Sequence, residues 1–320
     1  MSYTELILPL IEVTNTAAIA SAKTIGQGER KYSDKVATEA MREKLNEIDI
    51  QGTVVIGEGE RDEAPMLFIG EKVGTGKGLE IDIAVDPLEG TNLCATDSPN
   101  AICVFAVSEK GGLTHAPDTY MHKLVVGPPC KGKVDITWPV EKNIAAIAES
   151  YDIPASEVKI VVLERERNEE LVAQIRATGA KIRLIGDGDI CGGILAALPD
   201  NDVHALMGIG AAPEGVIKAA AMKALGGEIQ AIFYPRDAKG LQVDESAYQR
   251  LIEMGVEDPK KVYKTDDLAP GKNVLFIASG VNNGSVLKGV DFIDDQIFVQ
   301  SLVMDGTSQT IRYIDTQYQE

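Results

Sequence analysis

The feature that most constrains the fold is an alternation of short apolar runs with amphipathic segments in the second half of the chain. Apolar, β-branched runs bounded by turn residues predict strands, and apolar residues recurring every three or four positions predict helices. Such an alternation predicts α/β layering, in which helices cover a sheet. The expected strands lie at 159–163, 181–185, 203–207 and 274–278, and the expected helices at 168–178, 190–198 and 213–225.

The first half of the chain adds helices and further strands. The expected helices span 4–23 and a segment that Ser33 and Asp34 open, and the expected strands lie at 52–57, 81–85 and 101–107. The C-terminal stretch 297–318 is predicted to form two strands joined by a turn. Because 320 residues exceed what one hydrophobic core usually serves, we expect two subdomains. The polar, proline-bearing stretch at 151–156 is the expected boundary, which gives subdomains 1–150 and 151–320.

Composition restricts the partners and the compartment. The chain has 49 acidic and 31 basic residues, and its net charge of -18 disfavours binding to nucleic acid and to anionic membranes. An anionic substrate would therefore need local cations, such as divalent metal ions or a few arginines. The start resembles no signal peptide, no segment is expected to span a membrane, and the four cysteines show no Cys-x-x-Cys spacing. These observations favour a cytoplasmic protein.

The segment Asp86-Pro-Leu-Glu-Gly-Thr91 follows an expected buried strand. It places the carboxylates of Asp86 and Glu89, the hydroxyl of Thr91 and several backbone N–H groups at one strand end. Mg²⁺ prefers oxygen ligands, and backbone N–H groups bind phosphate, so this combination suits a metal and phosphate site. Taken alone, such a segment is more often only a proline turn.

Other acidic residues recur at similar places, and each has a structural alternative. Asp34 could be a helix N-cap, and Glu58 and Glu60 could be solvated loop charges. Glu214, after Pro213, could complement the dipole at the start of a helix. Together with the segment 86–91, these acids predict a cage for metal ions.

At this point the chain resembles a known family over nearly its whole length. The segments that carry the resemblance are 57–66, 86–91, 116–120, 186–189 and 208–215. They resemble the class II fructose-1,6-bisphosphatases, which are lithium-sensitive, metal-dependent phosphatases related to inositol monophosphatases. The resemblance implies a layered α/β/α/β/α sandwich of two subdomains and a homo-oligomer, either a dimer or a tetramer. Some members of this family also hydrolyse sedoheptulose-1,7-bisphosphate.

The resemblance also implies roles for individual residues. The implied ligands of Mg²⁺ or Mn²⁺ are Asp34, Glu58, Asp86, Glu89 and Glu214. The implied catalytic residues are Thr91, Asp62 and Glu60. The implied substrate-binding residues are Arg30, Glu89, Gly90, Thr91, Tyr120, Arg165, Glu166, Arg167, Asp187, Gly188, Asp189 and Ala211.

The chain departs from the family pattern at three places. The chain has Arg165-Glu-Arg-Asn168 where Lys-Pro-Arg-His is common, which keeps two cations for a distal phosphate but inserts an acid between them. Arg30 stands where a lysine is common, and Ala211 replaces a frequent glycine. The first departure leaves the substrate preference open.

The expected reaction is hydrolysis of the 1-phosphate of fructose-1,6-bisphosphate by metal-activated water, with sedoheptulose-1,7-bisphosphate as an open second substrate. Thr91 would orient that water, and water attack is favoured over a phosphothreonine intermediate. Two alternatives stay open. One is an inositol-phosphate or nucleotide-3′-phosphatase, which needs only one phosphate site. The other is a non-catalytic regulator that binds sugar phosphates.

Overall fold

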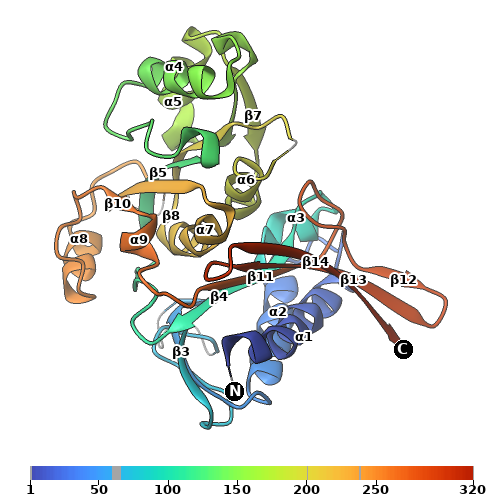
Figure 1. Cartoon of the computed structure of the whole chain (residues 1–320). Coiled ribbons are helices and arrows are strands. Elements are labelled where there is room, and N and C mark those ends of the chain that lie inside the picture. Colours follow the sequence, from blue (N-terminus) through green and yellow to red (C-terminus); the bar gives the residue numbers. More distant parts are fainter. Residues whose placement is uncertain (1, 60–65, 200, 238, 320) are drawn as a thin grey trace. The chain divides into compact units, whose positions relative to one another are not determined.

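The chain folds into two compact units in a computed structural model that describes residues 2–59, 66–199, 201–237 and 239–319 (Figure 1). The first unit comprises Met1–Leu113 and Gly271–Glu320, and the second unit comprises Thr114–Pro270. This division differs from the expected boundary after residue 150, because the following tyrosine, Tyr151, still belongs to a helix inside the second unit. The chain leaves the first unit once and returns to it.

The first unit contains a mixed sheet. Among the described residues it has eight strands in the order β12-β13-β11-β4-β3-β1-β2, with β14 paired to β13. Of the pairs that these described strands form, only β1 and β3 are parallel, and the others are antiparallel. The strands are β1 (Ile50–Ile56), β2 (Lys72–Val73), β3 (Leu79–Glu89), β4 (Ile102–Glu109), β11 (Leu275–Gly280), β12 (Asp291–Ile293), β13 (Gln296–Asp305) and β14 (Thr310–Gln319). The helices are α1 (Tyr3–Ala22), α2 (Arg30–Leu45) and α3 (Thr91–Ala95).

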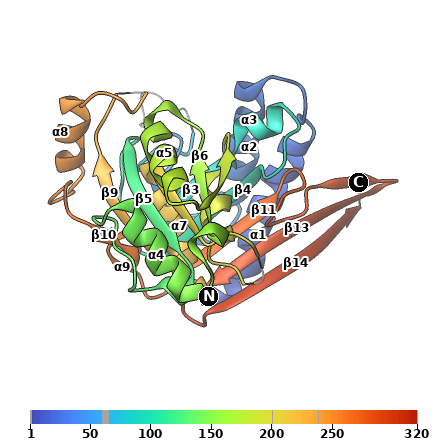
Figure 2. The same cartoon turned by 90° about the horizontal axis from the view of Figure 1, so that it is seen from above.

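Helices α1 and α2 cover one face of this sheet, as Figures 1 and 2 both show. Leu10 of α1 and Met41 of α2 are completely buried together with Phe105 of β4 and Ile277 of β11. Removing this apolar surface from water is the main stabilising contribution of the layer. The packing fixes α2 against the sheet whose strand ends carry the candidate metal ligands.

No segment was expected to span a membrane, but helix α1 is long and apolar enough to do so. It is the only such helix among the described residues. The hydrogen bonds of its polar residue Asn15 show where the helix packs. The side-chain oxygen of Asn15 accepts hydrogen bonds from Ser279 (2.7 Å) and Ser301 (2.6 Å), and its amide donates to the hydroxyl of Tyr318 (2.8 Å). These bonds join α1 to strands of its own unit, which is the behaviour of a core helix.

The second unit has its own sheet, with helices on both faces. Among the described residues its six strands follow the order β10-β9-β5-β8-β6-β7. The strands are β5 (Tyr120–Val126), β6 (Lys159–Leu163), β7 (Lys181–Ile185), β8 (Ala205–Ala211), β9 (Glu228–Tyr234) and β10 (Tyr263–Lys264). The helices are α4 (Val140–Tyr151), α5 (Glu169–Ala177), α6 (Asp189–Leu195), α7 (Ala212–Leu225), α8 (Glu245–Glu253) and α9 (Thr265–Leu268), with a 3-10 turn η3 (Glu166–Asn168).

Alternate residues of β6 serve the two faces of this second sheet. Ile160 and Val162 are buried in the core that α4 and α5 share. Val161 faces the other way, where it comes so close to Gly192 of α6 that a Cβ on that glycine would lie 2.9 Å from the valine side chain. The sheet is therefore a middle layer, and each unit is an α/β structure. The predicted α/β class with two subdomains is confirmed.

Candidate functional site

In the first unit, strand β3 carries the acids of the segment 86–91 within the strand rather than after it. Asp86 lies opposite Val104 of β4 and Glu89 lies opposite Ile102, with a break in register between them. Val104 and Ile102 are two positions apart and so point to the same face, which places Asp86 and Glu89 on one face although they are three positions apart. The bulge thus brings two carboxylates together that a regular strand would separate.

Gly90 turns the chain from β3 into α3. Its φ of +84° is left-handed, and a Cβ there would lie 2.9 Å from Leu93, so glycine is required on both counts. Thr91 begins α3, and N–H groups in a first helical turn have no partner within the helix. The turn therefore places the start of α3 directly after Glu89 in the chain, and the phosphate site stays a prediction.

Glu58 follows β1, the parallel neighbour of β3. Ile56 is the register partner of Ala84, and Glu58 lies two residues beyond Ile56 as Asp86 lies two residues beyond Ala84. The N–H of Glu58 donates to the carbonyl of Leu67 at 3.1 Å. Parallel strands end at the same sheet edge, so the pairing brings Glu58 beside Asp86.

Asp34 does not open a helix. Helix α2 begins at Arg30 with Glu29 as its N-cap, so both the expected start at Ser33–Asp34 and the N-cap alternative for Asp34 are wrong. The second turn of α2 packs beside α3, because Thr24 Oγ1 lies 2.7 Å from Ser33 Oγ and 3.6 Å from Cys94 Sγ. This contact brings Asp34 near the segment 86–91, while Arg30 is exposed.

The charges of Asp34 and Asp86 act on the same buried group. Burial raises the pKa of the Cys103 thiol, and the carboxylates of Asp86 and Asp34 raise it further. Burial also raises the pKa of Asp34 itself. Asp34, Glu58, Asp86 and Glu89 are the four predicted carboxylate ligands that belong to the first unit. Such hard oxygen donors fit Mg²⁺ or Mn²⁺.

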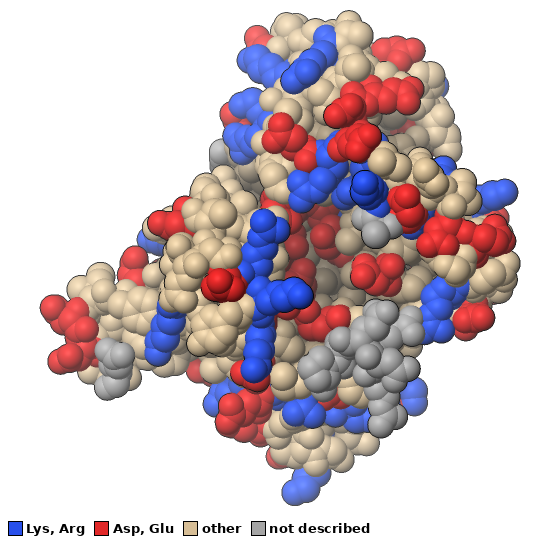
Figure 3. Space-filling model, turned by 180° about the vertical axis from the view of Figure 1, so that it is seen from behind, with Lys and Arg blue, Asp and Glu red and all other residues tan. Residues whose placement is uncertain are grey.

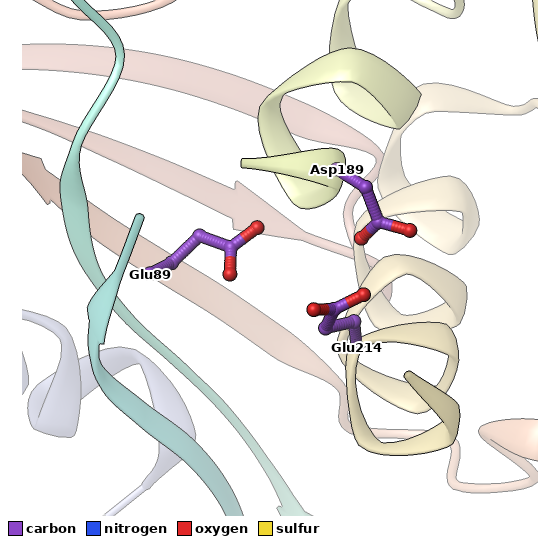
Figure 4. Close-up of side chains that lie close together, drawn as sticks. All are labelled: Glu89, Asp189 and Glu214. Carbon is purple, nitrogen blue, oxygen red and sulfur yellow. The ribbon is translucent and has the colours of Figure 1, made fainter. Parts of the chain in front are cut away.

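In the second unit, Asp189 and Glu214 point toward one another from the starts of α6 and α7, as Figure 4 shows. Lys123 donates to Asp189 Oδ2 at 2.5 Å and to Glu214 Oε2 at 3.1 Å, and Lys218 donates to Asp189 Oδ1 at 2.5 Å. Burial alone would raise the pKa of Asp189, but the two ammonium groups outweigh it and lower that pKa. Asp189 is therefore a fixed carboxylate.

Sequence reasoning missed Lys123 and Lys218, which are completely buried. A signal was present, since each lysine interrupts an otherwise apolar stretch, Leu124–Val126 after Lys123 and Ala219–Ala221 after Lys218. A buried lysine needs an acidic partner. Asp189, which the family resemblance assigns to the substrate, supplies that partner for both.

The predicted sugar-binding residues are only partly brought together. Tyr120 and Ala211 are register partners on β5 and β8, and the guanidinium carbon of Arg167 lies 4.4 Å from the centre of the Tyr120 ring. Arg165 and Glu166 instead line a cavity of about 430 Å³ beside α5. Arg165 nevertheless lies close enough to Arg167 for the two positive charges to act on each other.

The remaining predicted residues are Asp187, Gly188, Glu60 and Asp62. Gly188 takes a left-handed φ of +80° at the start of α6, and its N–H donates to Asp187 Oδ1 at 3.2 Å. Glu60 and Asp62 lie outside the described residues.

Comparison with known proteins identifies the family of this chain. A family model described as bacterial fructose-1,6-bisphosphatase, glpX-encoded, matches residues 4–318. The chain belongs to this family. It is therefore a metal-dependent phosphatase, as the resemblance predicted.

Curated relatives match over almost the full chain. The protein of Synechococcus elongatus is 49% identical over 97% of this chain and 94% of its own length. Those of Nostoc sp. and Trichodesmium erythraeum are 48% identical, again over 97% and 94%. Each is named D-fructose 1,6-bisphosphatase class 2/sedoheptulose 1,7-bisphosphatase.

Proposed function

We propose that this enzyme hydrolyses the 1-phosphate of fructose-1,6-bisphosphate to fructose 6-phosphate and phosphate, and that sedoheptulose-1,7-bisphosphate is its second substrate. The observation that carries the proposal is the bulge in β3, which puts Asp86 and Glu89 on one face directly before the turn at Gly90. The names of the relatives support the choice of substrate.

The proposed ligands of the metal ions are Asp34, Glu58, Asp86, Glu89 and Glu214. The metal is Mg²⁺ or Mn²⁺, because every donor is a carboxylate oxygen. When bound, these ions supply Lewis-acid stabilisation of the phosphoryl oxygens and lower the pKa of water.

The chain's own groups orient the reactants. The hydroxyl of Thr91 holds the attacking water in line with the scissile bond, and the N–H groups of Gly90 and Thr91 stabilise charge on the phosphoryl oxygens. Glu60 and Asp62 are further catalytic residues of the proposal. Arg30, Tyr120, the cations at 165 and 167, and the segment 187–189 with Ala211 hold the rest of the substrate.

We further propose that the enzyme acts in the cytoplasm as a homo-oligomer and binds neither nucleic acid nor membrane. On the face shown in Figure 3, Lys and Arg lie interspersed with Asp and Glu, whereas nucleic-acid binding calls for a concentrated basic patch. The net charge of -18 supports the same view.

A phosphate-release screen tests the proposed function. Sugar bisphosphates, inositol phosphates and nucleotide 3′-phosphates are offered with Mg²⁺ or Mn²⁺, with and without Li⁺. We expect release from the two sugar bisphosphates and inhibition by Li⁺. Preferential release from inositol phosphate or a nucleotide would favour the related phosphatases, and binding of sugar bisphosphates without release would favour the regulator.

A further inference from the structure

Two tyrosines of the second unit, Tyr120 and Tyr234, lie directly opposite each other on antiparallel strands β5 and β9. Side chains of such a pair leave the same sheet face with their Cβ atoms about 5 Å apart. An arginine guanidinium group lies over each ring. The Cζ of Arg167 is 4.4 Å from the centre of the Tyr120 ring, and the Cζ of Arg236 is 4.1 Å from that of Tyr234. Two Arg–Tyr stacks therefore stand on neighbouring strands.

Neither guanidinium forms a close ion pair with a described residue, although the carboxylates of Glu214 and Asp189 act on Arg167 from farther away. Over the described ranges of the chain, no carboxylate lies within ion-pair distance of Arg167 or Arg236. The Nε of Arg167 donates to the carbonyl of Ile209 at 3.1 Å, whereas the Nε of Arg236 is buried and finds no acceptor among the residues that the structure describes. The chain has 49 acidic and 31 basic residues, so acidic partners are plentiful. Two neighbouring arginines without a close ion pair therefore do not stabilise the fold through salt bridges. A phosphate group would supply the missing charge and acceptors.

The connection between β9 and α8 links the two stacks. Arg236 forms a β-bridge with Val243, which folds this connection back on itself. Gly240 then packs against the first stack, because a Cβ there would lie 2.5 Å from Arg167 Cδ and 3.4 Å from Tyr120 Cε2. The segment that begins with Arg236 thus continues into contact with Arg167.

There is also space beside Arg236. A cavity of about 460 Å³ is lined by Tyr234, Arg236, Tyr248 and Lys260, among other residues. Glu245 lines it too, but not within ion-pair distance of Arg236. The cavity therefore offers cations and aromatic rings to a ligand.

We propose that Arg236 is a further guanidinium of the site that holds the distal phosphate of the sugar bisphosphate, beside Arg167. The inference rests on the proposed function and deepens it. Arg236 adds a cation to those of Arg165 and Arg167, the two arginines that the family resemblance assigns to this phosphate. Its role is to bind and select the substrate, so the reacting phosphate does not depend on it.

The test compares substrates with and without a distal phosphate in the Arg236→Gln variant. We expect kcat/KM for fructose-1,6-bisphosphate to fall about 10- to 100-fold, the range for losing hydrogen bonds to a charged group. The kcat/KM for fructose 1-phosphate should stay within about twofold of that of the unchanged enzyme. The Kd of fructose 6-phosphate, measured by calorimetry, should rise by the same factor by which kcat/KM for fructose-1,6-bisphosphate falls. Arg236→Lys should restore part of the loss.

The matched control is Arg250→Gln on α8, which removes the same charge from an exposed pair with Glu253 and should change neither substrate. Gly240→Ala is the second variant if Arg236→Gln does not fold, because the added methyl displaces Arg167 and should produce the same selective loss. Equal losses for both substrates, or none, would overturn the inference. The proposed function fails if the unchanged enzyme releases no phosphate from any sugar bisphosphate. The inference about Arg236 fails separately if the Arg236→Gln variant binds fructose 6-phosphate as tightly as the unchanged enzyme does.

Discussion

Lys123 donates a hydrogen bond of 2.5 Å to Oδ2 of Asp189, and both side chains are enclosed completely within the second unit. Lys218 approaches the other oxygen of the same carboxylate, and Lys123 also reaches Glu214. The network joins β5, α6 and α7. It therefore fixes the orientation of Glu214, the proposed metal ligand of this unit.

Asp189→Asn should destabilise the chain strongly, because it leaves two buried ammonium groups with half of their compensating charge. Removing one partner of a buried ion pair costs about 3 to 5 kcal/mol. Asp202→Asn is the control, since Asp202 is exposed and pairs at the surface with Lys159 and Arg183. That change should cost less than about 1 kcal/mol. Urea unfolding measures the free energy of unfolding of both variants. Equal losses of that free energy would contradict the stabilising role of the buried network.

Glu109 should contribute stability that depends on pH. Burial alone would raise its pKa, but hydrogen bonds from the N–H groups of Lys272 and Asn273 outweigh this and lower the pKa to about 2 from an ordinary value of 4.5. Because the folded pKa is the lower one, this stability is present above pH 4.5 and is lost as pH falls toward 2.

Glu109→Gln should therefore lower the Tm most at neutral pH. The difference from the unchanged protein should shrink between pH 4.5 and 2. A Tm difference that stays constant over this range would contradict the prediction. It would show that the ionised carboxylate of Glu109 does not stabilise the segment at Lys272 and Asn273.

Gly57→Ala should damage both folding and catalysis. A Cβ at this position would lie 1.9 Å from the carbonyl oxygen of Leu67, so the backbone must move and displace Glu58. We expect phosphate release to fall at least about tenfold, since small misplacements of catalytic groups cost up to about a hundredfold. Gly70→Ala is the control, because its surroundings are open and only its φ of +93° opposes alanine. A fully active Gly57→Ala variant would refute this account of how Glu58 is placed.

Asn15→Ala should destabilise the first unit by about 1 to 3 kcal/mol, the cost of leaving buried polar partners unsatisfied. The hydroxyl of Ser301 loses its acceptor on α1, Ser279 keeps only Thr14 there, and the hydroxyl of Tyr318 loses its donor. Thr16→Ala serves for comparison, because the hydroxyl of Thr16 bonds only to the carbonyl of Glu12 in its own helix. Urea unfolding that ranks the two variants equally would contradict a core role for Asn15.

Local patterns predicted some elements well and others poorly. The strands at 159–163 and 181–185 were predicted to the residue, because apolar, β-branched runs with clear flanks mark them. Strands β5 and β9 were missed, since Lys123, Glu228 and Gln230 interrupt their apolar pattern. Each of these polar groups is buried with a partner from another element, which no local pattern reveals.

The candidate site shows the same limit. The acids of the segment 86–91 were found from type and spacing, but the strand was expected to end at residue 85, whereas β3 continues through Glu89. The bulge that aligns Asp86 with Glu89 depends on pairing with β4, and the partnership of Asp189 with two lysines depends on three separate elements. Tertiary contacts decide both features.

The most direct test of the central claim is phosphate release from fructose-1,6-bisphosphate with Mn²⁺, comparing the unchanged enzyme with Glu89→Gln. Loss of partners around metal ligands already costs about 10- to 100-fold, so losing a ligand should reduce release at least about a hundredfold. The account also predicts weaker Mn²⁺ binding and a Tm within a few degrees of the original. Undiminished release by Glu89→Gln, with Mn²⁺ binding unchanged, would contradict it.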